Sequence, residues 1–189
     1  MLLPTRPILR GDLVIRPYRN EDAAALVQSV TESIEHLRPW MPWIAHEPQS
    51  VDDRRAFIAE SNANWAGGGD MGFGIFIGEK VVGGCGLHRR VGPTGLEIGY
   101  WVHVDHVGRG IATTAAGALT SAAFTLPPIA YVEIHHDKAN VASGRVPEKL
   151  GFVLVAEAPD EIQSPADIGI DCAWSISRES WHGEPPWPD

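Results

Sequence analysis

A glycine loop between an apolar strand and an alanine-rich helix is the feature that most constrains this chain. The segment HVGRGIATTA, residues 106–115, places Gly108 and Gly110 on either side of Arg109 and then continues in small, helix-tolerant residues. Glycine lets the backbone come close to a ligand, and the first turn of the following helix offers N–H groups without carbonyl partners. The positive end of the helix dipole also attracts negative charge. The loop therefore predicts an anion site, and phosphate is the usual anion at such a site.

The order of the other signals predicts a single α+β domain over residues 1–180, with an irregular, proline-rich tail over residues 181–189. Apolar runs predict strands at 12–17, 72–78, 80–88, 96–104, 127–136, 153–156 and 170–177. Periodic patterns predict helices at 20–30, 50–65, 109–124 and 140–151. We expect Asn20 to cap the first helix, Ser50 and Asp53 to form a capping box, and Gly151 to close the last helix.

Charge and composition narrow the class of partner. The formal net charge of -9, without any run of Lys and Arg, argues against nucleic acid and fits a cationic substrate such as an amine. The first residues, MLLPTRPILRGD, are broken by prolines and charges, so they predict neither a secretory signal nor a membrane span. Cys85 and Cys172 lie far apart without metal-site spacing and are expected to be reduced thiols. We therefore expect a cytoplasmic protein with no membrane partner.

Three kinds of phosphate loop compete for the segment. A dinucleotide loop needs G-x-G-x-x-G near the N-terminus, whereas here Thr113 stands where the third glycine belongs and the loop comes late in the chain. A nucleoside-triphosphate loop needs G-x-x-x-x-G-K-[ST], which the sequence lacks. The third kind is an acyl-coenzyme A loop.

The segment EIGYWVHVDHVGRGIATTA resembles the central motif of the GNAT acyltransferases, in which [QR]-x-x-G-x-[GA] binds the coenzyme pyrophosphate. Gly110 and Ala112 match the last two motif positions, and Val107 stands where the family has Gln or Arg. The segments IEHLRPWMPW, EIGYWV and NVASGRVPEKLGF resemble the RimJ/RimL-like branch, the ribosomal-protein-alanine N-acetyltransferases, and the likeness runs over about residues 12–176. It implies a GNAT-like α+β fold. Its central, mostly antiparallel mixed sheet would have about six to seven strands, splayed at the coenzyme site and flanked by helices.

The resemblance also implies where the coenzyme binds. Main-chain N–H groups make most of the family's phosphate contacts, so Val107 is expected to weaken binding rather than to abolish it. Main-chain N–H groups around Trp101–His103 would hold the oxyanion. The implied coenzyme-binding residues are Trp101, Val102, His103, Val107, Gly108, Arg109, Gly110, Ile111, Ala112, Thr113, Asn140 and Ser143.

The implied roles of Asn140 and Ser143 compete with simpler ones. In the family this Asn bonds the pantetheine arm and this Ser approaches the sulfur, but without a ligand the two are a helix cap and a first-turn hydroxyl. Pro147 lies in the same helix and lacks the N–H that would bond the Ser143 carbonyl. We therefore expect the helix to be bent or tightened there, which leaves the direction of the Ser143 hydroxyl open.

Acyl transfer to an amine needs a neutral nucleophile, donors for the oxyanion and a proton for the leaving thiolate. Glu97 is our first choice for the general base, because it begins the strand that leads into the coenzyme loop. Strand alternation places it on one face with Gly99, Trp101 and His103. The alternative is that Glu97 is only an ion-paired strand residue. Other candidates for the base are Asp160, Glu161 and Glu133.

Two further pairs of residues, one of tryptophans and one of histidines, are considered for the functional site. Trp40 and Trp43, in RPWMPW, either pack beneath a loop or line the acceptor channel, and we count them with Glu97 as substrate-binding residues. His135 and His136 are neighbours on a strand and face opposite ways, so no metal site is expected.

The sequence is thus interpreted as that of an acetyl-CoA-dependent N-acetyltransferase, an acyltransferase with Glu97 and Ser143 as catalytic residues and no metal. The acceptor amine would attack directly in a ternary complex. The first candidate acceptor is the α-amino group of a protein or peptide, and the rival is a small amine such as a polyamine or an aminoglycoside. A non-catalytic acyl-CoA-binding module stays open because of Val107 and Pro147. A homodimer is compatible with the resemblance.

Overall fold

The computed structural model describes residues 3 and 5–187 and contains one mixed sheet of eight strands. The strands are β1 (Ile8–Arg10), β2 (Leu13–Arg16), β3 (Met71–Ile77), β4 (Lys80–His88), β5 (Gly95–Val102), β6 (Tyr131–Asp137), β7 (Val153–Pro159) and β8 (Ile170–Ser177). Their order across the sheet is β1-β2-β3-β4-β5-β6-β8-β7, and every neighbouring pair is antiparallel except β5 and β6.

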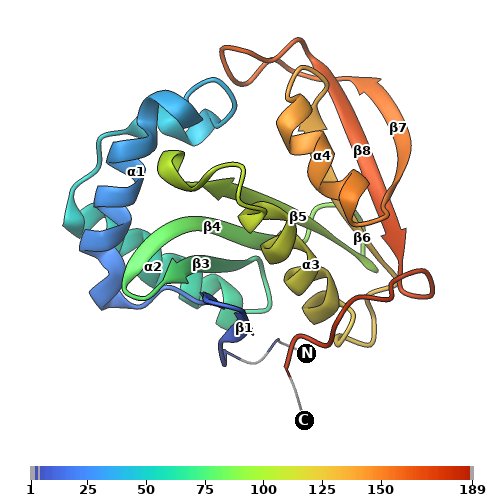
Figure 1. Ribbon diagram of the computed structural model, residues 1–189, viewed down its shortest axis with the longest axis horizontal. Coiled ribbons are helices and arrows are strands. Elements are labelled where there is room, and N and C mark those ends of the chain that lie inside the picture. The colour runs from blue at the N-terminus through green and yellow to red at the C-terminus, as the bar shows by residue number, and fades with distance from the viewer. Residues whose placement is uncertain (1–2, 4, 188–189) are drawn as a thin grey trace.

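Four α-helices and three short 3-10 turns connect the strands. They are η1 (Asn20–Asp22), α1 (Ala23–Leu37), η2 (Pro42–His46), α2 (Val51–Ala66), η3 (Val104–His106), α3 (Ile111–Ala123) and α4 (Val141–Lys149). Figure 1 shows α2 behind strands β3 and β4 and α3 in front of β5, so helices cover both faces of the sheet. Within residues 3 and 5–187, no helix combines the length and the apolar character that crossing a bilayer requires.

The predicted α+β architecture is confirmed, with one strand more than expected. All seven predicted strands are present, and β1 was missed because three residues are too few for a visible alternation, although Ile8 is fully buried. The capping box of Ser50 and Asp53 is confirmed, and Gly151 follows α4 with a φ of 79°. Residues 1, 2 and 4 of the predicted domain and residues 188 and 189 of the predicted tail lie outside the described residues.

The expected cap at Asn20 is wrong. Asn20 is the first residue of the 3-10 turn η1, and α1 begins three residues later at Ala23. The carboxylate of Asp22 instead accepts the N–H of Arg19 at 2.6 Å while it also binds the guanidinium of Arg16. The ion pair with Arg16, six residues earlier in the chain, fixes Asp22 at the start of the helix.

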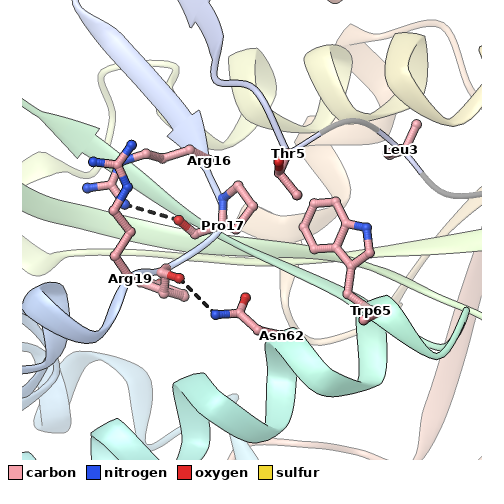
Figure 2. A pocket seen from close by; sticks show the side chains of 9 residues that line it. Leu3, Thr5, Arg16, Pro17, Arg19, Asn62 and Trp65 are labelled. Atoms are coloured by element: carbon pink, nitrogen blue, oxygen red, sulfur yellow. Dashed lines mark hydrogen bonds between the residues drawn. The ribbon is translucent and has the colours of Figure 1, made fainter.

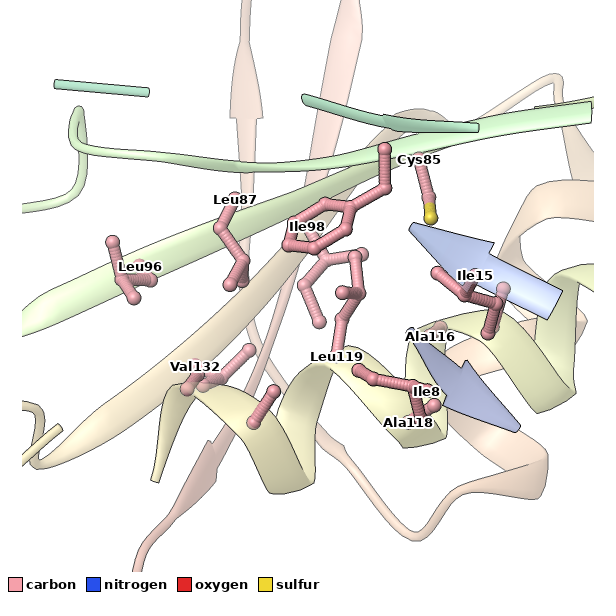
Figure 3. Close-up of a cluster of buried hydrophobic side chains, with 14 of the residues drawn as sticks. Ile8, Ile15, Cys85, Leu87, Leu96, Ile98, Ala116, Ala118, Leu119 and Val132 are labelled. Atoms are coloured by element: carbon pink, nitrogen blue, oxygen red, sulfur yellow. The ribbon is translucent and has the colours of Figure 1, made fainter. Parts of the chain in front are cut away.

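The main apolar core lies between the sheet and α3 (Figure 3). Alanines of α3 let the helix lie close to the strands, and Leu119 reaches between Leu87 and Ile98 of the neighbouring strands β4 and β5. A second apolar cluster joins α1 to the opposite face of the sheet through side chains such as Leu26, Val30 and Phe76. Cys85 and Cys172 are both buried free thiols, as expected.

The sheet divides at the one parallel pair. β5 and β6 pair only from Gly95 with Tyr131 to Glu97 with Glu133. Beyond these pairs β5 continues to Val102 beside β4, and β6 continues to Asp137 beside β8. The two strands therefore separate after Glu97, which is the splay that the resemblance implied.

Leu119→Ala is expected to lower the free energy of unfolding by about 2–5 kcal/mol, because it leaves a cavity where a fully buried leucine packs against two strands. Urea unfolding followed by circular dichroism measures the change. Leu9→Ala is the matched control, since Leu9 is 61% exposed and its loss should change stability by less than about 0.5 kcal/mol. Equal losses for the two variants would contradict the assignment of the core to the α3 face.

Candidate active site

The glycine loop ends in an array of main-chain N–H groups at the start of α3. Gly108 and Gly110 have φ values of 74° and 78°, in the left-handed region where a side chain would cause strain. The Gly110 carbonyl accepts the N–H of Thr114 at 2.9 Å. In the described part of the chain, no backbone or side-chain acceptor binds the N–H groups of residues 108–113. The loop therefore has the geometry of the predicted anion site.

His103 anchors this loop to α1. Its imidazole is fully buried, and its Nδ1 accepts the N–H of Asp105 at 3.1 Å. The proton must then be on Nε2, which donates to the carboxylate of Glu32 at 2.8 Å. The N–H of Val104 donates to the Ser33 hydroxyl at 3.2 Å. Two side chains of α1 thus hold the segment that leads from β5 into the loop.

The outer edge of β5 faces the gap left by β6. The N–H of His103 donates to the Val82 carbonyl at 2.9 Å, so it is not free for a ligand. Alternate residues of an antiparallel strand direct their N–H groups to opposite edges, so Trp101 points its N–H toward β4, as His103 does. Tyr100 and Val102 point theirs into the gap. Of the predicted residues Trp101, Val102 and His103, the alternation therefore leaves Val102 with its N–H toward the gap.

Tyr100 connects this edge to α4 and explains how the helix tolerates Pro147. The Tyr100 hydroxyl donates to the Ser143 carbonyl at 3.0 Å and lies 3.1 Å from the Ser143 hydroxyl. Pro147 has no N–H for that carbonyl, and the tyrosine takes the place of the missing donor. α4 runs from Val141 to Lys149 with Pro147 inside it. Burial raises the pKa of Tyr100 to about 12, so the hydroxyl stays protonated.

Asn140 caps α4 and also has a free donor. Its side-chain oxygen accepts the N–H of Ser143 at 3.1 Å, which is the simpler of the two roles considered. Its amide N–H₂ group has no acceptor among residues 3 and 5–187. The cap and a contact to a ligand are therefore compatible in one side chain.

Glu97 lies at the point where β5 and β6 separate, and Arg90 holds it. The Nε and Nη2 atoms of Arg90 donate to the two carboxylate oxygens at 2.7 and 2.5 Å. The Glu97 side chain is 10% exposed, whereas that of Arg90 is 60% exposed. The ion pair considered as the alternative role is thus present, and it occupies one lone pair of each oxygen.

A cleft of about 1300 Å³ runs along this region. One wall comes from α1, η2 and α2, and the floor is formed by β4, β5 and β6. Both Trp40 and Trp43 line the cleft, and the Trp43 ring packs edge-on against Trp101 with centroids 6.1 Å apart. Glu97, Asn140 and Ser143 also line it. The structure thus brings the predicted substrate-binding and catalytic side chains into one cleft.

Asp160 and Glu161, the other candidates for the base, are exposed and follow the edge strand β7. They do not line the cleft. Glu133 accepts from Nε2 of His135 at 3.0 Å, and Asp171 accepts from Nδ1 of the same ring at 2.8 Å. Both N–H groups of His135 are therefore committed to carboxylates.

His135 and His136 face opposite sides of the sheet, as expected. Nε2 of His136 accepts the indole N–H of Trp174 at 3.0 Å, beneath Gly144 of α4. Among the residues that the structure describes, no group of three His, Cys, Asp or Glu side chains is arranged to hold a metal ion.

Among the polar residues of the cleft that the sequence analysis missed are His88 and Asp70. Nδ1 of His88 lies 2.8 Å from Oδ2 of Asp70. Alternation could have placed His88 on the same face as Gly84 and Gly86 of its strand. Asp70 precedes β3, and its closeness to His88 depends on the pairing of β3 with β4, which no local pattern shows.

A second, smaller pocket of about 450 Å³ lies beside Arg16, Arg19 and Trp65 (Figure 2). The Arg16 guanidinium is bound to Asp22, and the Asn62 amide donates to the Tyr18 carbonyl at 3.1 Å. These two polar groups are therefore already paired within the chain.

Comparison with known proteins gives consistent results. A profile of the Acetyltransferase (GNAT) domain matches residues 12–153. YdaF of Bacillus subtilis, which carries the provisional name ribosomal N-acetyltransferase, is 27% identical over 175 residues, or 91% of this chain and 94% of YdaF. RimJ of Mycobacterium smegmatis, solved in complex with a CoA-disulfide, has a TM-score of 0.80 at 23% identity over 92% of this chain and 86% of RimJ. RimL, a ribosomal L7/L12 α-N-protein acetyltransferase solved with coenzyme A, has a TM-score of 0.83 at 19% identity over 93% of this chain and 99% of RimL. The two solved structures share the fold of this chain.

The cluster formed by His135, Glu133 and Asp171 makes the free energy of unfolding depend on pH. Burial lowers the pKa of His135, but the hydrogen bonds to Glu133 and Asp171 outweigh burial, so the pKa lies above its ordinary value. Because the pKa is raised in the folded state, the hydrogen bonds of His135 contribute their full stabilisation of the fold below about pH 6.5. This stabilisation is lost as the pH rises through the folded-state pKa. The difference in unfolding free energy between the wild type and His135→Gln should therefore shrink from pH 6 to pH 9 in urea titrations. His182→Gln, in the exposed tail, is the control, and a difference that grows with pH would contradict the assignment.

Proposed function

Because the chain belongs to the GNAT acetyltransferase family, we propose that it transfers an acetyl group from acetyl-CoA to a primary amine, first of all the α-amino group of a protein or peptide. The observation that carries this proposal is the row of N–H groups over residues 108–113, which have no acceptor in the described chain and lie beside the separation of β5 from β6. An anion site next to an open strand edge suits a ligand that has a diphosphate at one end and an extended amide arm at the other.

In the proposed complex, the pyrophosphate binds the main-chain N–H groups from Gly108 to Thr113, including those of Arg109, Ile111 and Ala112. The left-handed glycines keep side chains away from the phosphates, and the start of α3 adds the favourable end of its dipole. Val107 is 48% exposed and supplies no polar group, so the main chain must provide the affinity at this position.

The pantetheine arm would extend along the free edge of β5. The N–H of Val102 and the free amide of Asn140 supply donors for it on the two sides of the gap. Ser143 lies across the gap from β5, and its hydroxyl is 3.1 Å from that of Tyr100. This pair of hydroxyls supports Ser143 as the group that gives a proton to the departing sulfur.

The acceptor would enter through the cleft between Trp40, Trp43 and Glu97. The cleft lining holds the carboxylates Asp53, Glu60, Asp70, Glu97, Asp137 and Asp167 but only the guanidinium groups Arg54 and Arg90. This excess of negative charge favours a cationic amine. Glu97 would contact the ammonium group through the oxygen lone pairs that Arg90 leaves free.

An α-amino group suits such a site better than a lysine side chain. Its ordinary pKa of about 7.7–8.0 means that the neutral form costs roughly 1 kcal/mol at pH 7, whereas lysine at about 10.4 costs between about 4 and 5 kcal/mol. The names of YdaF and RimL refer to ribosomal acetylation and to α-amino acetylation. They support a ribosomal protein N-terminus as acceptor and the cytoplasm as the place of action. Small polyamines are the rival, since the acidic cleft attracts them equally.

Thiol release from acetyl-CoA should be fastest with peptides that carry a free N-terminus, compared with polyamines and aminoglycosides. Glu97→Gln should raise KM for the peptide by about tenfold, because one charge contact to the ammonium is worth about 1–2 kcal/mol, and Ser143→Ala should lower kcat.

The alternatives give different results in the same assay. Turnover on polyamines alone would contradict the α-amino assignment. Coenzyme binding without turnover on any amine would identify a non-catalytic acyl-CoA-binding module.

Gly110→Glu should abolish binding of acetyl-CoA in titration calorimetry, because the carboxylate repels the pyrophosphate and the side chain strains a left-handed position. Gly151→Glu is the matched control, since Gly151 has a φ of 79° and equally open space at Cβ but lies after α4. Unchanged affinity in the Gly110 variant would show that the coenzyme binds elsewhere.

A further inference from the structure

His88 and Asp70 form a carboxylate–imidazole pair at the side of the cleft. Oδ2 of Asp70 accepts from Nδ1 of His88 at 2.8 Å, and Oδ1 accepts the N–H of Arg89 at 2.9 Å. Burial raises the pKa of Asp70, but these two hydrogen bonds outweigh it, so the pKa lies below its ordinary value and the carboxylate stays ionised. An ionised carboxylate on Nδ1 fixes the tautomer that leaves Nε2 of a neutral imidazole with a lone pair.

The His88 ring lies on the floor of the cleft, and its Nε2 atom is beside β5. Gly86 of β4 and Gly99 of β5 are cross-strand partners. A Cβ on either glycine would lie 3.1 or 3.3 Å from Nε2 of His88, so the ring rests over both of them. Glu97 is the cross-strand partner of His88 itself and shares its face of the sheet. Nε2 therefore lies beside the part of β5, just after Glu97, at which β6 departs.

The other polar side chains at this place are already engaged. Arg90 binds both carboxylate oxygens of Glu97, and two carboxylates hold the ring of His135. Both nitrogens of His136 are also bonded, one to the Asp137 carbonyl and one to Trp174. Nε2 of His88 has no hydrogen-bond partner within residues 3 and 5–187. Among the three histidines of β4 and β6 that line the cleft, His88 is the one with a nitrogen available to a ligand.

We propose that His88 is the general base that takes the proton from the acceptor amine and that Asp70 is the residue that positions its ring. This inference rests on the proposed acetyl transfer and names the proton acceptor within it. In this arrangement Glu97, held by Arg90, binds the ammonium group, and His88 accepts its proton.

The proposed step is balanced as follows. The ammonium group gives one proton to Nε2 of His88, and the nitrogen lone pair so formed attacks the carbonyl carbon of the thioester. An N–C bond forms and the C–S bond breaks. A second proton leaves the same nitrogen and ends on the thiol sulfur through the Ser143 hydroxyl, while His88 returns its proton to water through the cleft.

The kinetic test uses acetyl-CoA and the amine of the acceptor panel that is turned over fastest. His88→Ala should lower kcat by about 100-fold, the lower range for a general base, while KM for acetyl-CoA stays within twofold. Free imidazole should restore part of the rate, because it can enter the space over Gly86 and Gly99. His182→Ala, in the exposed tail, controls for any general effect of imidazole. Normal turnover by His88→Ala, or a loss that imidazole does not restore, would overturn the proposal.

The positioning role of Asp70 has its own readout. Asp70→Asn presents an amide N–H₂ group that can donate to Nδ1, which moves the ring proton to Nε2 and removes the lone pair from the cleft. Nitrogen-15 NMR of the histidine rings should show Nδ1–H in the wild type and Nε2–H in Asp70→Asn, with a loss of kcat of about tenfold or more. Unchanged kcat despite the tautomer change would contradict the role of Asp70.

The NMR measurement needs no acceptor, so the two proposals can fail separately. If no amine is turned over but the ring shows the Nδ1–H tautomer, the proposed function has failed and the assignment of a base falls with it. If an amine is turned over and the wild-type ring shows the Nε2–H tautomer, only the inference about His88 is overturned.

Discussion

The separation of β5 from β6 after Glu97 is the constraint on which the rest of the site depends. A strand that loses its neighbour exposes N–H groups that must find other partners, because unpaired backbone groups away from water are costly. Here the free edge of β5 borders a large cleft, and the Tyr100 hydroxyl crosses the gap to the Ser143 carbonyl. This single bond also supplies the donor that Pro147 removes from α4.

The polar groups around the gap are held from outside it. Glu32 of α1 fixes the buried ring of His103, which sets the start of the glycine loop. Asp70, just before β3, fixes His88, and Arg90 fixes Glu97. In each case the side chain that faces the cleft or supports the loop is oriented by a residue from a different part of the chain, so the site is preorganised by tertiary structure rather than by local geometry.

The sequence predicted those features that depend on neighbours along the chain. The glycine loop, the capping box at Ser50 and the alternation of β5 could be predicted, since each is a local pattern of backbone freedom or burial. The pairing of Asp70 with His88 and the bond from Tyr100 to Ser143 could not be predicted, because they join residues that only the folded sheet brings together. For Glu97, strand alternation predicted the face of the sheet on which the side chain lies, but it did not predict the ion pair with Arg90.

A structure of the complex with acetyl-CoA would show whether the glycine loop binds the coenzyme. Pyrophosphate oxygens are expected within about 3 Å of the N–H groups of residues 108–113, with the pantetheine arm between β5 and β6 and the thioester facing His88 and Glu97. A coenzyme bound elsewhere, with those N–H groups left without an acceptor, would contradict this expectation.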